Sequence, residues 1–146
     1  MTSDWLSELA PATIDVVIEL PGNRKHTLTI GTLSHAEWEE AGAEIKSPKV
    51  PHTKMVEGSD KLLPNPEDAV YLRDLRLSYD RRTAYRVARH FEKAGKVVPG
   101  GNALEKADAI LKMDEGIYSA LVKVIVQLSE GNRQIVENAA DSFRGE

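Results

Sequence analysis

The sequence predicts an α+β fold in which an N-terminal β-hairpin precedes a mainly α-helical bundle of about four to five helices. Two observations predict it: paired runs of β-branched residues before residue 32, and capped stretches with apolar residues at helical spacing after residue 66. A chain of 146 residues, 41% of them hydrophobic, is long enough for one core but marginal for two. We therefore expect a single domain over residues 1–146.

The hairpin is expected over residues 13–31. Residues 13–20 are rich in β-branched side chains, and Pro21, Gly22 and Asn23 then supply residues typical of a turn. Residues 25–30 alternate polar and apolar side chains with a period of two. The alternation predicts a second strand and one buried face.

A short helix is expected next, running to about Ile45. Ser34 and Glu37 have the spacing of a capping box, in which each side chain accepts a hydrogen bond from the other residue's amide. The helix carries the carboxylates Glu37, Glu39, Glu40 and Glu44. We interpret them as a solvated acidic face, because the sequence does not supply the histidine partners that metal sites need.

Residues 46–66 are expected to form a flexible loop. The segment contains four prolines and Gly58 and has little periodicity. Loops of this length in a compact domain are uncommon and are either functional or disordered, and both readings stay open.

The helical region is expected to span residues 67–143 and to begin with a long helix that ends before Gly95. Asn65 and Pro66 supply a cap and a first-turn proline, and the acids that follow favour a helix start. One side of this helix is expected to face the core. Its apolar residues are Val70, Leu77, Ala84, Val87, Ala88 and Phe91.

The other side of the long helix is apolar first and basic afterwards. Leu72, Leu75 and Tyr79 are followed on that side by Arg82 and Arg86, and then by further basic residues. One interpretation is a surface for a partner that is apolar at one end and acidic at the other. The other is that the apolar residues pack under the hairpin while the arginines are merely solvated. Both remain open, and these five residues are the candidate partner-binding site.

Three further helices complete the expected bundle. Asn102 and Glu105 predict a cap for a short amphipathic helix over residues 103–112, and residues 115–129 are expected to form a buried helix. Apolar residues at helical spacing suggest a last helix near residues 135–143. At the N-terminus, Trp5 lies in a short turn that we expect to fold onto the core.

The sequence motifs point away from catalysis. The chain has no cysteine, its four histidines do not pair at metal-binding spacing, and it contains no phosphate-binding loop or nucleophile motif. We therefore expect a protein that is not an enzyme and has no catalytic residue, metal site or cofactor. The net charge of -4 argues against nucleic acid as a main partner, and no apolar run is long enough to span a membrane.

Several local phrases resemble the tail assembly chaperones of long-tailed bacteriophages. The phrases are PEDAVYLRDL at 66–75, the run 87–100 that ends in Pro99-Gly100, LEKA at 104–107 and MDEGIYSAL at 113–121. Together with the hairpin before them, they cover most of residues 13–130.

The resemblance implies a role in virion assembly. A protein of this family binds the tape measure protein, a long and largely helical chain, and keeps it soluble while the tail tube protein polymerises around it. The resemblance therefore implies the tape measure protein and possibly the tail tube protein as partners. It also implies a location in the cytoplasm of the infected bacterial host and absence from the mature virion. In this family a frameshifted extension would join near residues 131–146.

Two other functions are compatible with the residues. The first is a structural component of the virion, such as a head-tail connector or a tail-terminator subunit. The second is a small regulator that binds nucleic acid, since Arg81 and Arg82 lie close to Tyr79 and Tyr85.

Overall fold

The N-terminal hairpin forms as the alternation of side chains predicts. In the computed structural model, which describes residues 12–128, β1 (Thr13–Leu20) pairs antiparallel with β2 (Arg24–Gly31) over their full lengths. Gly22 and Asn23 adopt positive φ angles of 83° and 58°, which close the turn between the strands. Alternate residues of one face are buried, among them Val16, Ile18 and Ile30. The α+β prediction is confirmed.

The capping box after the hairpin is also confirmed. Helix α2 (His35–Glu44) begins where the Ser34 hydroxyl accepts a hydrogen bond from the Glu37 amide at 3.2 Å. The Glu37 carboxylate in turn accepts a hydrogen bond from the Ser34 amide at 3.1 Å. Ala41 and the capping residue Ile45 are buried on the side that faces the rest of the molecule.

The long helix α3 (Ala69–Lys93) starts two residues later than the sequence predicts. Its cap is Asp68, whose carboxylate accepts a hydrogen bond from the Tyr71 amide at 3.0 Å. Asn65 instead closes the preceding turn, because its carbonyl oxygen accepts from the Asp68 amide at 3.2 Å. At the other end the chain leaves the helix through Gly95, which has a φ of 85°.

The last described helices follow the prediction closely. Helix α4 (Ala103–Leu111) is capped by Asn102, and a further helix occupies residues 115–128. The prediction that this last helix is buried is wrong, because only Leu121 and Ile125 among these residues are buried. Asp114 caps this last helix by accepting a hydrogen bond from the Ile117 amide at 3.2 Å. The turn around Trp5 and the helix expected near 135–143 lie outside the described residues.

The core lies where the hairpin, α2, the second half of α3, α4 and the last helix meet. Its buried members come from all five elements, and Ile30 and Val87 are the largest side chains that are fully buried. Gly31 permits the close approach of the hairpin to α3, because a Cβ at this position would lie only 2.2 Å from the Lys93 Cβ. We call this part of the molecule the body.

Residues 46–66 contain a second hairpin, so the prediction of a loop without regular structure is wrong. Strand β3 (His52–Met55) pairs antiparallel with β4 (Leu62–Pro64), with an irregularity between His52 and Lys54. The prolines masked the strands in the sequence, yet Pro51 directly precedes β3 and Pro64 is the last residue of β4, so both lie at strand ends, where a missing N–H is tolerated. The flexibility of the segment stays a prediction.

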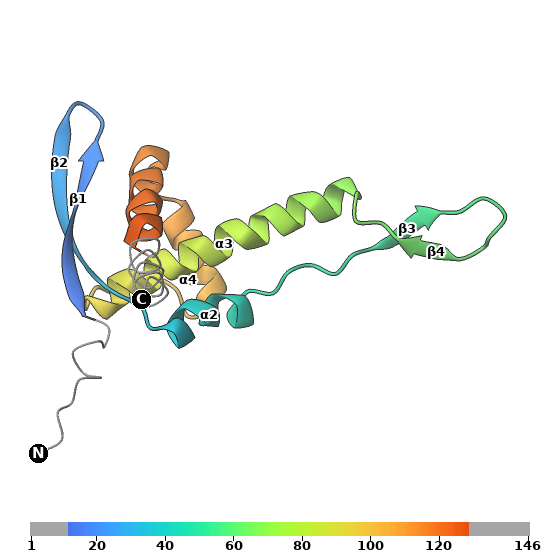
Figure 1. Cartoon of the computed structure of the whole chain (residues 1–146), viewed down its shortest axis with the longest axis horizontal. Coiled ribbons are helices and arrows are strands. Elements are labelled where there is room, and N and C mark those ends of the chain that lie inside the picture. The colour runs from blue at the N-terminus through green and yellow to red at the C-terminus, as the bar shows by residue number, and fades with distance from the viewer. Residues whose placement is uncertain (1–11, 129–146) are drawn as a thin grey trace, which may run out of the picture.

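The second hairpin and the first half of α3 project from the body (Figure 1). We call residues 46–80 the arm: a connection from α2, the hairpin β3–β4 and the N-terminal half of α3. No residue of β3 or β4 is buried. The hairpin is joined to α3 by the Thr53 hydroxyl, which donates a hydrogen bond to the Asp68 carboxylate at 3.3 Å.

Candidate protein interface

Helix α3 changes its surroundings halfway along its length. From Ala84 onward it contributes several buried residues, including Val87 and Ala88, whereas Ser78 is the only buried residue before that point. Val70 and Leu77, which were predicted to face the core, are 56% and 38% exposed. The prediction fails there because the elements that cover the second half of the helix do not extend along the arm.

The predicted apolar surface is exposed on the arm. Leu72 and Tyr79 are 48% and 55% exposed, and Leu75 is half-buried. The N-terminal hairpin does not cover them, because it contacts the opposite end of α3, where Gly31 meets His90. The interpretation in which these residues pack under the hairpin is therefore wrong.

The two predicted arginines have a different role from the one expected. Arg82 donates hydrogen bonds to the Ile45 carbonyl oxygen at 2.7 Å and to the Ser47 hydroxyl at 2.9 Å. Arg86 donates to the Trp38 carbonyl oxygen at 3.0 Å, and its guanidinium carbon lies 4.4 Å from the centre of the Trp38 ring. Arg82 and Arg86 thus hold α2 against α3. This internal use corrects the expectation that both arginines are offered to a partner.

The acidic residues of α2 complete the same contact. Glu37 lies 3.2 Å from an Arg89 nitrogen and 3.1 Å from the Lys93 ammonium, and Glu40 lies 3.6 Å from Arg89. Tyr85 donates a hydrogen bond to Glu40 at 2.8 Å. The predicted solvated acidic face is therefore wrong for Glu37 and Glu40, because the basic stripe of α3 pairs with them.

The shifted pKa values of Glu37 and Tyr85 favour the protonation states that these contacts need. Burial is the largest influence on Glu37 and opposes its charge, but hydrogen bonds from Ser34 and Lys93 together lower its pKa below the ordinary value. Burial, followed by the neighbouring Glu40 carboxylate, raises the pKa of Tyr85 to about 12. Glu37 is thus an acceptor and Tyr85 a donor at neutral pH.

Exposed apolar side chains concentrate on the arm. Of the twelve large apolar residues that are exposed between residues 12 and 128, eight lie between residues 55 and 79. They are Met55, Val56, Leu62, Leu63, Val70, Leu72, Leu77 and Tyr79. The four in the hairpin were missed from the sequence, although two adjacent apolar pairs on either side of Gly58 were a usable signal.

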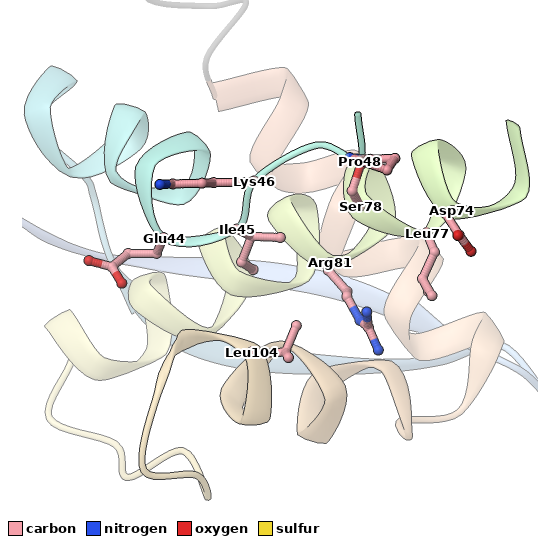
Figure 2. A pocket seen from close by; sticks show the side chains of 9 residues that line it. All are labelled: Glu44, Ile45, Lys46, Pro48, Asp74, Leu77, Ser78, Arg81 and Leu104. Atoms are coloured by element: carbon pink, nitrogen blue, oxygen red, sulfur yellow. The ribbon is translucent and has the colours of Figure 1, made fainter. Parts of the chain in front are cut away.

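A cavity of about 350 Å³ lies at the root of the arm, between the end of α2, α3 and α4. Figure 2 shows Leu77 and Arg81 extending from α3, and Leu104 from α4, toward the same space. Arg81 is 3.1 Å from Asp108 of α4, so this cation is also used within the molecule. The cavity continues the apolar surface of the arm toward the body through Leu77 and Leu104, which are both exposed.

The arm also carries cations that are not paired. Lys46, Lys49, Lys54, Lys61 and Arg76 make no ion pair with any residue that the structure describes. Residues 46–64 contain four lysines against one glutamate and one aspartate, in a chain whose net charge is -4. The connection and the hairpin are therefore locally positive, whereas residues 65–80 carry four acids against Arg73 and Arg76, so the arm as a whole has no net charge.

Neither a membrane-spanning helix nor a metal-binding cluster occurs in the described part of the chain. Over residues 12–128, no helix is long and apolar enough to cross a membrane. Within the same range, no three His, Cys, Asp or Glu side chains gather in a way that would hold a metal ion.

Comparisons with known proteins add no relative. No protein-family model, no curated protein and no solved structure matches this chain.

Proposed function

We propose that this protein is a tail assembly chaperone of a long-tailed bacteriophage, which binds the tape measure protein through its arm and keeps it soluble. The single observation that carries the proposal is the concentration of exposed apolar side chains on the arm. A chaperone for a helical, aggregation-prone chain needs such a surface beside charges that keep the complex in solution.

The construction of the arm supports a binding role. A two-stranded hairpin without a covered face is marginally stable by itself. Leu62 and Leu63 are 50% and 44% exposed and Met55 is 82% exposed, so the hairpin β3–β4 buries little apolar surface of its own. A partner that covers these residues would stabilise both the hairpin and the complex.

The proposed partners and location follow from this role. The tape measure protein is the main partner, and the tail tube protein is a second one that would take its place around the same chain. The chaperone acts in the cytoplasm of the infected host and leaves before the virion matures.

Co-purification with the tape measure protein tests the proposal. We expect the double substitution Leu75→Asp and Tyr79→Asp to leave the protein folded and to reduce recovery of the tape measure protein at least about ten-fold, since charges would replace the apolar contact. Val97→Asp is the matched control, because Val97 is 93% exposed but belongs to the body. Undiminished recovery by the double variant contradicts the proposal.

A structural virion component, such as a head-tail connector or a tail-terminator subunit, is the second candidate. The projecting arm favours it, because an extension that contacts a different surface of the next subunit makes a head-to-tail interface, and such interfaces form rings when they close. Mass spectrometry of purified virions separates the two functions. A connector is present at fixed stoichiometry, whereas a chaperone is absent.

A further inference from the structure

An apolar cavity opens on the body, and no residue of the arm lines it. It has a volume of about 390 Å³ and is bounded by Leu28 of β2, Phe91 of α3, Ile110 of α4 and the connection between these two helices. Its floor belongs to the core, since Ile110 and Val98 are only 6% and 8% exposed, whereas Val97 beside them is 93% exposed. Cavities of this size and apolar lining are typical binding sites. We call it the body cavity.

The chain enters the described structure close to this cavity. The Thr32 amide donates a hydrogen bond to the Ala12 carbonyl oxygen at 2.8 Å, and the Ala12 amide donates one to the Thr32 hydroxyl at 2.8 Å. Leu28 lies four residues before Thr32, which corresponds to about 13 Å along a strand. Trp5 precedes Ala12 by seven residues, which span up to about 23 Å when extended. Residues 1–11, which we call the N-terminal segment, are therefore long enough to bring Trp5 to the cavity.

The charges of the N-terminal segment and of the body cavity are opposite. The segment carries Asp4 and Glu8 and no basic side chain. Lys96 is the only charged residue that lines the cavity, and it makes no ion pair within the described part of the chain. Its ammonium donates a hydrogen bond to the Thr29 carbonyl oxygen at 3.2 Å and lies 5.1 Å from the centre of the Phe91 ring, so it is held at the cavity. An acidic segment is thus attracted there.

We infer that Trp5 of the N-terminal segment fills the body cavity, with Asp4 and Glu8 directed toward Lys96. A tryptophan brings about 150–250 Å² of surface that can be buried, more than an aliphatic side chain offers. The contact would join the segment to β2, α3 and α4 and close the open side of the core. The inference does not rest on the proposed function, because the cavity belongs to the body and not to the arm.

Fluorescence tests the inference, because the chain has only one other tryptophan, Trp38. In the full-length variant Trp38→Phe, the emission of Trp5 is expected to be blue-shifted relative to the same variant unfolded in urea. It is also expected to be quenched several-fold less by acrylamide, since a buried indole is shielded from the solvent. The difference in emission between the wild type and Trp5→Phe gives the same information without a change at Trp38. Emission and quenching equal to those of the unfolded chain overturn the inference.

Substitutions at the mouth of the cavity locate the buried tryptophan. In the Trp38→Phe background, Val97→Asp and Lys96→Glu are each expected to raise the quenching of Trp5, because each places a carboxylate where the acidic segment would lie. Both residues are exposed, so neither variant loses a buried side chain, and circular dichroism checks the folding. The matched control is Val126→Asp, at a body residue that is 43% exposed and lies outside the cavity; it is expected to change nothing. Equal quenching in all three variants overturns the inference.

Dilution distinguishes the chain's own segment from that of a second copy. If Trp5 fills the cavity of its own chain, its quenching is expected to be independent of protein concentration. Protection of Trp5 that is lost on dilution would show that a second copy supplies the tryptophan, and this would overturn the inference.

Discussion

The body and the arm share one helix, but they treat its apolar residues in opposite ways. In the second half of α3, Val87 is 1% exposed, whereas Leu72 in the first half is 48% exposed. The helix itself does not change, since both halves belong to one uninterrupted element from Ala69 to Lys93. The difference comes from what packs around each half. Covered apolar residues stabilise the fold, and uncovered ones remain available for a partner.

The largest difference in stability is expected between an alanine substitution in the core of the body and one on the arm. Ile30→Ala in the body is expected to lower the free energy of unfolding by about 3 kcal/mol, because it removes a buried side chain and leaves a cavity. Leu72→Ala in the arm is expected to lower it by less than about 1 kcal/mol. Urea denaturation of both variants measures the difference. Similar losses in the two variants would mean that the arm is packed as tightly as the body.

The contact between α2 and α3 is expected to respond to the loss of one charge. Glu37→Gln preserves a hydrogen-bonding side chain at the capping position but removes the ion pairs with Arg89 and Lys93. We expect a loss of about 1 kcal/mol, since both pairs are partly exposed. The control is Glu39→Gln on the same helix, since Glu39 makes no ion pair with any residue between 12 and 128. An equal effect of both substitutions would contradict a specific role of the Glu37 pairs.

His90 is expected to make the stability of the body depend on pH. Its ring Nδ1 lies 2.7 Å from the Gly31 carbonyl oxygen, and its Nε2 is buried without a partner in the described structure. Burial lowers its pKa below the ordinary value of 6.5, so the unfolded chain takes up the proton first.

The stability due to neutral His90 is complete above pH 6.5 and decreases as the pH falls below that value, by at most about 1.4 kcal/mol per pH unit. Urea midpoints at pH 7.5 and pH 5.5 measure it. His90→Gln is expected to flatten this part of the profile. An unchanged slope in the variant would assign the effect to other groups.

The smallest expected effect on stability comes from removing the hairpin of the arm. Replacing residues 52–64 with a short glycine-serine linker is expected to change the free energy of unfolding by less than about 0.5 kcal/mol, because no residue of β3 or β4 is buried. The same replacement is expected to weaken binding of the tape measure protein, which co-purification measures. A large loss of stability would show that the hairpin belongs to the body.

Local chemistry made much of the fold predictable. The first hairpin, the Ser34 capping box, the Asn102 cap and the last described helix each depend on residues close together in the sequence. The start of α3 was misplaced because Asn65 and Asp68 are both good caps, and only the turn before the helix decides between them. The hairpin β3–β4 was missed because its prolines hide strands that are only a few residues long.

The candidate site was predictable only in part. The apolar residues Leu72, Leu75 and Tyr79 were identified from helical spacing, and their incomplete burial agrees with the expected surface. The roles of Arg82 and Arg86 were not predictable, because their partners Ile45 and Trp38 lie some forty residues away in the chain. The apolar residues of the second hairpin joined the site only because β3–β4 lies at the end of α3 (Figure 1).

The sequence alone determined the class of the fold, the order of most of its elements and the existence of a long helix with two apolar sides. These properties depend on periodicity, capping and turn residues, which act over a few positions. Only the tertiary structure decided which part of each side is covered. The same stripe of α3 is occupied by α2 along one half and open along the other, because burial depends on which distant segments arrive there.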